Sequence, residues 1–254
     1  MAQFNSGGLK LAYDDIGARN RDRPIILIHG FASNRNENWR RLGWYGALER
    51  RGTRFVALDC RGHGESSKPH DPSEYSAGKM IDDLFALMDH LGVSRADLLG
   101  FSMGARLALA AAMTKPERVG DLILGGLGGR LFDPPPSGAP IAEAMEAPSI
   151  DAIGNPLLKG FRKFAEEQGE DRIALAACAR ARAAALQPES LSGFNVRTLV
   201  VAGAHDELAG DPQELAGYMP NARAVTLPGC NHFSAIAHAL FKASVFDFLD
   251  GEMI

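Results

Sequence analysis

Short runs of consecutive apolar residues recur along the chain and predict strands that are buried on both faces. The runs cover residues 25–28, 55–58, 96–101, 119–124 and 198–202, with a further strand predicted at residues 222–227. Each run is too short for a helix, and several are rich in β-branched side chains. Such strands are typical of a parallel sheet that is covered by helices on both sides.

Segments between these strands carry apolar residues at the spacing of amphipathic helices. The predicted helices cover residues 39–48, 81–91, 103–114, 212–218 and 234–249. Strands that alternate with helices predict the α/β class, with a mostly parallel, doubly wound sheet. Before the first buried run, the alternating residues 9–13 predict a half-exposed strand, and residues 14–23 are expected to form a polar turn region.

The alternation of strands and helices stops after the fourth buried run and resumes at the fifth. A glycine cluster at residues 125–129 marks the start of the interruption, and an alanine-rich helix is predicted at residues 171–186. We therefore expect an α/β core formed by residues 1–127 and 193–254. Residues 128–192 are expected to form a small, mainly helical cap insertion that lies over the end of the sheet.

The composition is that of an ordinary globular protein. The 254 residues are 46% hydrophobic and 7% aromatic, which is enough to bury a sizeable core. A formal net charge of −4 gives no electrostatic case for binding nucleic acid or an anionic membrane. The cysteines Cys60, Cys178 and Cys230 are scattered and odd in number, as is typical of reduced thiols. Since the start also lacks a secretory signal pattern, we expect a cytoplasmic protein, and its oligomeric state stays open.

The strand at residues 96–101 runs into the pentapeptide Gly100-Phe101-Ser102-Met103-Gly104 and then into a predicted helix. A serine in this position, with glycines around it, is typical of a sharp, strained turn where helix and strand crowd together. The hydroxyl then stands at the head of a helix, where free N–H groups favour developing negative charge. Taken alone, the pentapeptide is also compatible with an ordinary turn or a helix cap.

Other polar residues follow the predicted strands at the same edge of the sheet. His29-Gly30 follows the first buried run, Asp59 the second and Asp206 the fifth, and His232 follows the last strand after a short loop. Because chemistry gathers at the carboxyl ends of parallel strands, we expect these side chains to lie near Ser102.

The chain resembles the α/β-hydrolase-fold serine hydrolases over nearly its whole length outside the insertion. The motifs that carry the resemblance are His29-Gly30-Phe31, Asp59-x-Arg61-Gly62-His63-Gly64-x-Ser66, Gly100-Phe101-Ser102-Met103-Gly104, Gly203-x-x-Asp206 and Gly229-x-x-His232. In this family the serine, the acid and the histidine follow one another in this order. All five motifs coincide with predicted strand ends, which makes the resemblance specific.

The resemblance implies a role for each residue of the site. Ser102 is the expected nucleophile, His232 the base that accepts its proton, and Asp206 the acid that orients the imidazole. The backbone N–H groups of Phe31 and Met103 are expected to form the oxyanion hole. The residues expected to support this site are His29, Gly30, Gly100 and Gly104. No cofactor and no metal are expected, because the sequence lacks a phosphate-binding glycine motif and a helical His/carboxylate metal pattern.

The residues themselves leave other assignments of the acid and the base open. Asp211 and Asp121 are alternative acids, although Asp211 is better placed as the N-cap of the helix at residues 212–218. His205 adjoins the expected acid and is an alternative base. The remaining histidines outside the motifs are His70, His90 and His238.

The resemblance implies a hydrolase that cleaves the carboxylic ester of a small substrate through an acyl-enzyme on Ser102. Serine in this position argues against the aspartate-dependent chemistry of haloalkane dehalogenases and epoxide hydrolases. Lactonase, thioesterase, C–C bond hydrolase and perhydrolase activities stay open on the same triad, as does a ligand receptor with slow or no turnover. Apolar residues of the insertion, among them Phe161 and Phe164, predict an apolar substrate pocket.

Overall fold

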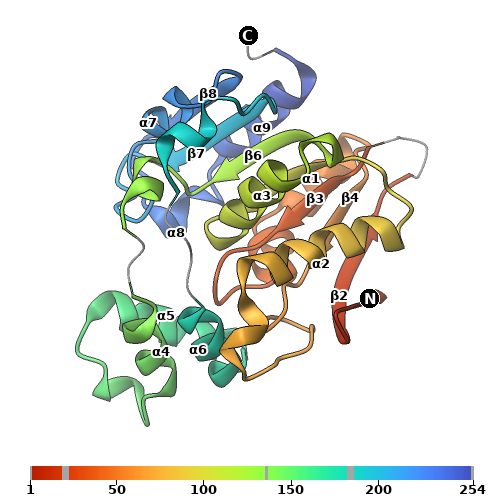
Figure 1. The fold of residues 1–254 in the computed structure, drawn as a ribbon. Helices are drawn as coiled ribbons and strands as arrows, with labels where there is room; N and C mark the ends of the chain where they lie inside the picture. The colour runs from red at the N-terminus through yellow and green to blue at the C-terminus, as the bar shows by residue number, and fades with distance from the viewer. Residues whose placement is uncertain (1, 19–22, 135–136, 182–185, 253–254) are drawn as a thin grey trace.

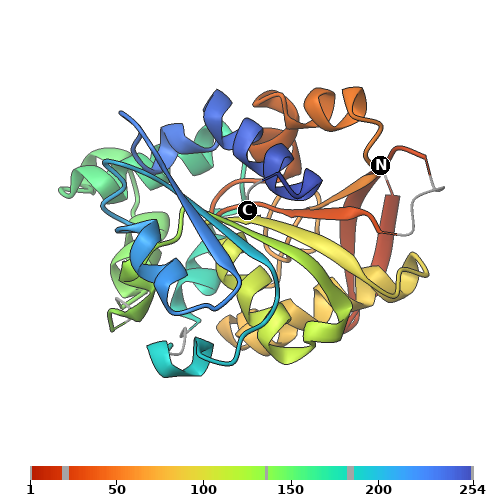
Figure 2. The ribbon, with the colours of Figure 1, turned by 90° about the horizontal axis from the view of Figure 1, so that it is seen from above.

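The computed structural model describes residues 2–18, 23–134, 137–181 and 186–252. An eight-stranded sheet crosses the centre of this part of the chain, with helices on both faces (Figure 1; Figure 2). In sheet order the strands are β1 (Ala2–Ser6), β2 (Leu9–Ile16), β4 (Phe55–Leu58), β3 (Ile25–Ile28), β5 (Ala96–Phe101), β6 (Val119–Gly125), β7 (Thr198–Gly203) and β8 (Ala222–Leu227). The first two pairs are antiparallel and all later pairs are parallel, so the predicted α/β architecture is confirmed.

Helices fill the connections between the strands. Outside the insertion they are the π-helical turn η1 (Asn36–Arg41), α1 (Trp44–Arg50), η2 (Pro72–Tyr75), α2 (Ala77–His90), α3 (Met103–Thr114), η3 (Pro116–Arg118), α7 (Pro212–Gly217), α8 (His232–Ala235) and α9 (Ala239–Asp250). The insertion holds η4 (Gly129–Phe132), α4 (Ala139–Glu146), η5 (Ile150–Ala152), α5 (Pro156–Glu167), α6 (Arg172–Arg180) and η6 (Pro188–Leu191). Within the described residues, none of these helices has the length and apolar character needed to cross a bilayer.

Apolar side chains form a separate core on each face of the sheet. In β5, Leu98 packs on the face that carries α2 and α3, whereas its neighbour Leu99 packs on the opposite face with Trp44 and Phe241. Successive side chains of a strand point to opposite faces, so only a continuous apolar run can fill both cores. Burial of each large side chain contributes roughly 1.5–3 kcal/mol to the stability of the fold.

The N-terminal strands extend further than the sequence predicts. β2 continues into the polar turn predicted at residues 14–23, so that prediction is wrong for its first part. Asp14 and Asp15 stay in the sheet because the end of β2 pairs with β4. Arginines also contact both carboxylates: Arg40 donates to Asp14 at 2.9 Å and Arg54 to Asp15 at 3.0 Å. These partners come from distant segments, so the local pattern does not reveal them.

Two predicted helices are interrupted in the structure. The helix predicted at residues 39–48 consists of the π-helical turn η1 and the helix α1, because Gly43 between them adopts a φ of 79°. The last predicted helix divides into α8 and α9. Its second part begins where His238 Nδ1 accepts a hydrogen bond from the Leu240 N–H and caps the new helix.

In the described part of the insertion between β6 and β7, the helices α4, α5 and α6 lie to one side of the sheet (Figure 1). α4, α5 and α6 share an apolar cluster with Ala32, which lies in the loop at the carboxyl end of β3. α6 ends at Arg180, earlier than the predicted 171–186, and residues 182–185 of that prediction lie outside the described residues. The division of the chain into a core and a cap at residues 128 and 192 stays a prediction.

Candidate active site

Ser102 lies in a strained turn between β5 and α3. Its φ of 54° and ψ of −112° fall in a region that costs a non-glycine residue on the order of 1–3 kcal/mol. The turn needs small neighbours: a side chain on Gly100 would lie 2.3 Å from the Gly104 carbonyl oxygen, and one on Gly104 would lie 2.1 Å from the Ile28 carbonyl oxygen. The predicted crowding of helix and strand is therefore present, and it fixes Ser102 at the edge of the sheet.

His232 meets Ser102 from the C-terminal part of the chain. It is the first residue of α8, a short helix that Asn231 caps. The loop before it packs closely against β7, since a side chain on Gly203 would lie 2.3 Å from the Cys230 carbonyl oxygen. This packing places His232 Nε2 at 2.9 Å from Ser102 Oγ. The distance is that of a hydrogen bond along which a proton can pass.

Asp206 follows β7 and contacts the other ring nitrogen of His232. Its Oδ1 and Oδ2 lie 3.0 and 2.9 Å from His232 Nδ1. Oδ1 also accepts hydrogen bonds from the N–H groups of Leu208 and Ala209, and the residue is only 4% exposed. Because a carboxylate accepts hydrogen bonds, Nδ1 carries the ring proton and Nε2 presents its lone pair to Ser102.

The residues left open as alternatives lie elsewhere. Asp211 accepts a hydrogen bond from a backbone N–H at the start of α7 and is its N-cap, as the sequence predicts. Asp121 pairs with Arg23 and Arg197 at the amino ends of the strands. His205 is exposed to solvent. Among the described residues, no group of three or more His, Cys, Asp or Glu is placed to hold a metal ion.

Two backbone N–H groups beside Ser102 are available to a bound anion. Met103 is the first residue of α3, where an N–H has no helical partner, and Phe31 lies in the turn after β3. Neither N–H donates a hydrogen bond to any described residue. The turn lies against the serine, since a side chain on Gly30 would be 3.5 Å from Ser102 Cβ. Both N–H groups therefore belong to segments that adjoin Ser102 and have no hydrogen-bond partner among the described residues.

The fold and this site can be compared with known proteins. A sequence model described as the alpha/beta hydrolase fold matches residues 23–148, a stretch that includes Ser102. The crystal structure of the enol-lactonase from Burkholderia xenovorans LB400 is similar to the chain with a TM-score of 0.79 and 25% identity, over 98% of this chain and 100% of that one. The chain has the α/β hydrolase fold.

Two further relatives of the chain are hydrolases as well. A hydrolase from Pseudomonas aeruginosa PA01 is 27% identical with a TM-score of 0.75, over 98% of this chain and 97% of that one. A 2-hydroxymuconate semialdehyde hydrolase of Pseudomonas putida is 29% identical over 257 residues, which cover 89% of this chain and 86% of the relative. Several other curated relatives match over only 30% to 41% of their own length.

Two buried histidines hold the loops beside the site of this α/β hydrolase. His29 Nε2 accepts a hydrogen bond from the Cys60 N–H at 3.0 Å, and its Nδ1 lies 2.8 Å from the Gly30 carbonyl oxygen. His63 Nδ1 lies 2.9 Å from the Arg61 carbonyl oxygen. Burial lowers the pKa of His29 to about 4 and the pKa of His63 to about 3. Both rings are therefore neutral near pH 7.

Aromatic rings surround the outer side of the site. The ring centroid of Phe161, from α5, lies 6.1 Å from that of Phe31 and 5.7 Å from that of Phe233. The ring of Phe233 lies 5.7 Å from that of His232. Phe161 thus connects the insertion with both sides of the site. The sequence predicts Phe161 as a pocket residue but does not single out Phe233, although its position next to His232 is a signal that could have found it.

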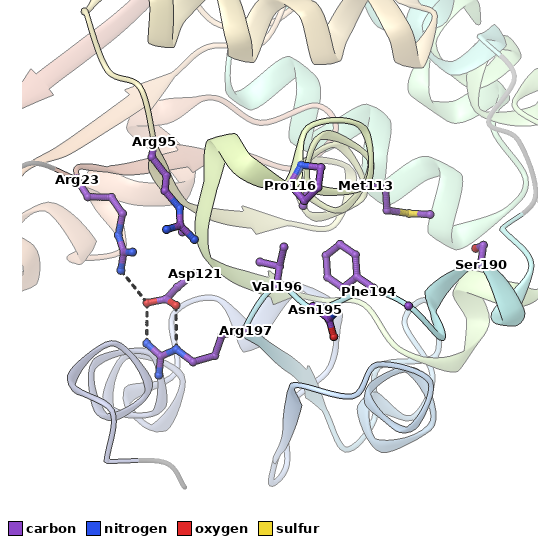
Figure 3. A pocket seen from close by; sticks show the side chains of 13 residues that line it. Arg23, Arg95, Met113, Pro116, Asp121, Ser190, Phe194, Asn195, Val196 and Arg197 are labelled. Atoms are coloured by element: carbon purple, nitrogen blue, oxygen red, sulfur yellow. Dashed lines mark hydrogen bonds and ion pairs between the residues drawn. The ribbon is translucent and has the colours of Figure 1, made fainter.

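A separate pocket of about 680 Å³ lies at the amino ends of the strands, away from Ser102 (Figure 3). Three of the charged side chains that line it, Arg23, Asp121 and Arg197, form ion pairs. Arg23 contacts Asp97 at 2.8 Å and Asp121 at 3.2 Å, and Arg197 contacts Asp121 at 2.6 Å. Burial raises the pKa of Asp97 to about 6. Because these pairs join the beginnings of neighbouring strands, we assign them to the stability of the sheet.

Proposed function

We propose that this chain is a serine hydrolase that cleaves the carboxylic ester of a small, apolar substrate through an acyl-enzyme on Ser102. The observation that carries the proposal is the continuous pair of hydrogen bonds from Ser102 Oγ to His232 and from His232 to Asp206, with shortest distances of 2.9 Å each. A serine hydroxyl is a weak nucleophile, and it needs a base within reach of its proton. The neutral Nε2 of His232 supplies that base.

The first half-reaction forms the acyl-enzyme. Ser102 Oγ attacks the ester carbonyl carbon while its proton moves to His232 Nε2, and Asp206 stabilises the imidazolium that results. The carbonyl oxygen becomes negatively charged and accepts hydrogen bonds from the N–H groups of Phe31 and Met103. The tetrahedral intermediate then expels the alcohol, which takes the proton from His232. The acyl group stays on Ser102.

The second half-reaction releases the acid. His232 Nε2 accepts a proton from a water molecule, and the water oxygen attacks the acyl carbonyl carbon. The same two N–H groups stabilise the second tetrahedral intermediate. Ser102 Oγ then departs with the proton from His232, and the carboxylic acid leaves. These reaction steps use only side chains and backbone groups of the chain, together with water.

The surroundings of the site favour an apolar substrate. Phe31, Phe161 and Phe233 present rings on the outer side of the triad, and the apolar cluster of the insertion continues from them. Pockets of this kind bind the non-reacting part of a ligand by burying its apolar surface. We therefore propose that residues 128–192 act as a cap that sets substrate choice.

Two relatives support related reactions on the same triad. The Burkholderia xenovorans LB400 protein is an enol-lactonase, and a lactone is a cyclic ester that the same acyl-enzyme steps would open. The Pseudomonas putida relative is named for a semialdehyde substrate and not for an ester. Because of this relative, we retain hydrolysis of a C–C bond next to a carbonyl group as the second candidate function.

The cysteines support action in a reducing compartment such as the cytoplasm. Cys60, Cys178 and Cys230 are all free thiols. Burial raises the pKa of Cys60 and Cys178, which keeps both groups protonated and poorly reactive. We propose a cytoplasmic location on this ground.

A substrate panel tests the proposed function. The panel contains p-nitrophenyl esters of rising chain length, lactones, thioesters and a vinylogous 1,5-diketone, with Ser102→Ala as the blank. We expect the wild-type protein to turn over esters or lactones and the variant to lose this activity. Turnover of the diketone alone would replace the ester assignment by C–C hydrolysis, and absence of any turnover would favour a ligand receptor.

A further inference from the structure

A buried carboxylate of the insertion contacts two loops beside the site. Glu170 lies between α5 and α6 and is 7% exposed. Its Oε1 accepts a hydrogen bond from Asn34 Nδ2 at 2.9 Å, and the Gly64 N–H lies 3.1 and 2.9 Å from Oε1 and Oε2. A buried carboxylate is costly unless N–H groups satisfy it. Both donors lie outside the insertion, so these hydrogen bonds connect the insertion to the rest of the protein.

The Asn34 side chain connects Glu170 to the turn that contains Phe31. Its Nδ2 donates to Glu170, and its Oδ1 accepts a hydrogen bond from the Glu37 N–H at 2.9 Å, in the first turn of η1. Farther along η1, Asn38 Oδ1 accepts a hydrogen bond from the N–H of the residue before Phe31, at 2.8 Å. Phe31 therefore lies between two residues that hydrogen bonds hold in place, Gly30 and Asn34. The bond that holds Asn34 goes to Glu170 of the insertion.

The loop after β4 supplies the other contact of Glu170. Asp59 already joins this loop to the turn, because its Oδ1 accepts from the Arg35 N–H at 2.7 Å and its Oδ2 from the Glu65 N–H at 2.8 Å. Gly64 fits between them only without a side chain, which would lie 2.2 Å from Asp59 Oδ2. By binding Gly64 as well as Asn34, Glu170 connects both loops to the insertion.

The same part of the insertion contacts the turn on its apolar side. Ala32, next to Phe31, is fully buried and has a strained φ of 60°. It packs in one cluster with Ala165 and Leu175 of the insertion. The Glu170 N–H donates to the Ala165 carbonyl oxygen at 3.0 Å, so the polar and apolar contacts come from one hydrogen-bonded segment of the insertion.

We propose that Glu170 is a positioning residue that keeps the Phe31 N–H directed at the oxyanion formed during attack by Ser102. The role rests on the proposed function, since the oxyanion forms only if Ser102 attacks a carbonyl carbon. The insertion then contributes to the rate of the chemical step as well as to substrate choice. A misplaced donor stabilises the transition state less but leaves substrate binding largely intact, so the loss falls on kcat and not on KM.

The test compares Glu170→Gln with the matched control Asp171→Asn. The glutamine puts an amide group where Oε2 now accepts from Gly64 at 2.9 Å, so one donor faces another and the contact of residue 170 with the loop after β4 is weakened. Asp171 is the adjacent residue, contacts His70 at 2.9 Å and caps α6, a role that asparagine also fills. The measurements are kcat and KM for p-nitrophenyl acetate and the inhibition constant of a trifluoromethyl ketone, which forms an oxyanion on the serine.

We expect Glu170→Gln to lower kcat roughly 10-fold or more, as for a small misplacement of a catalytic group. The KM should stay within about 2-fold, and inhibition by the ketone should weaken in proportion to kcat/KM. Asp171→Asn should match the wild type. If Glu170→Gln does not fold by circular dichroism, Asn34→Ser takes its place, because serine can cap η1 but cannot reach Glu170.

The role is wrong if the folded variant keeps the wild-type kcat, if only KM changes, or if Asp171→Asn shows the same loss. Equal losses would mean that any loosening of the insertion has this effect. A wild-type protein that neither hydrolyses the ester nor binds the ketone would overturn the proposed function and this role together. An active wild type with an unaffected variant would overturn the role alone.

Discussion

Ser102 Oγ and His232 Nε2 lie 2.9 Å apart although 130 residues separate them in the chain. The sheet brings them together, because β5, β6, β7 and β8 are parallel neighbours whose carboxyl ends meet at one edge. β5 ends just before Ser102, and the loop after β8 leads to His232. Asp206, from the end of β7, completes the group. Any change that moves one of these strand ends will therefore act on the triad.

The acid can be identified by comparing Asp206→Asn with Asp211→Ala. The first change should lower kcat by roughly 10³–10⁴-fold with the fold intact, because a neutral amide no longer stabilises the imidazolium or selects the tautomer of His232. The second removes only the N-cap of α7 and should cost about 1 kcal/mol of stability with kcat unchanged. Steady-state kinetics and urea unfolding measure both effects. Reversed kinetic losses would make Asp211 the acid.

The role of the insertion in substrate choice can be tested at Phe161. Phe161→Ala removes the ring that lies between Phe31 and Phe233, so it should change the order of preference in an ester panel. A lost apolar contact should shift kcat/KM for a given substrate by about 1–3 kcal/mol. The matched control is Leu157→Ala, an exposed position of the same helix, which should keep the wild-type order. A Phe161→Ala variant with an unchanged order would place the substrate elsewhere.

The tight turn at the serine makes a prediction about stability. Gly104→Ala places a methyl group 2.1 Å from the Ile28 carbonyl oxygen, so helix and strand must separate. We expect a loss of roughly 2 kcal/mol or more in the free energy of unfolding and a large loss of activity. Gly160→Ala is the control, because no atom lies within 4 Å of the added methyl group and the residue is inside α5. This variant should be more stable by about 0.5–1 kcal/mol.

The buried histidines make stability depend on pH. The folded-state pKa values of His29 and His63, about 4 and about 3, lie below the ordinary value of 6.5. The unfolded chain therefore binds more protons below pH 6.5, and stability falls as pH falls. Between pH 7.5 and 6 the loss should be roughly 1 kcal/mol for each of the two histidines. Urea unfolding at several pH values measures it.

One further buried group bears on this pH prediction. Asp97, whose pKa is raised to about 6, has the opposite sign, but its contribution changes mainly below pH 6. Between pH 7.5 and 6 the two histidines therefore outweigh Asp97, which offsets roughly 0.4 kcal/mol of their combined loss. Stability that stays constant or rises across this interval would show that the two rings are not buried in neutral form.

Much of the fold was predictable because the signals are local. A strand buried on both faces needs a continuous apolar run, and the Ser102 turn needs small residues at Gly100 and Gly104. The resemblance then assigned Asp206 and His232, and the structure places His232 next to Ser102 and Asp206 next to His232.

Other features depend on partners that are distant in the chain. Glu170 contacts Asn34 and Gly64 across 136 and 106 residues, so no local pattern distinguishes it from a solvated glutamate. The extension of β2 through Asp14 likewise depends on an arginine from another segment. These contacts become visible only when the sheet has brought the segments together.

The most direct test of the central claim is the mass of the protein during turnover. The reaction with p-nitrophenyl acetate is quenched in acid within the burst phase, and the protein is digested and mapped. We expect one acetyl group on the peptide that contains Ser102, a matching burst of p-nitrophenol, and neither signal in Ser102→Ala. An acetyl group on another residue such as Cys230, or a burst that persists in Ser102→Ala, would contradict an acyl-enzyme on Ser102.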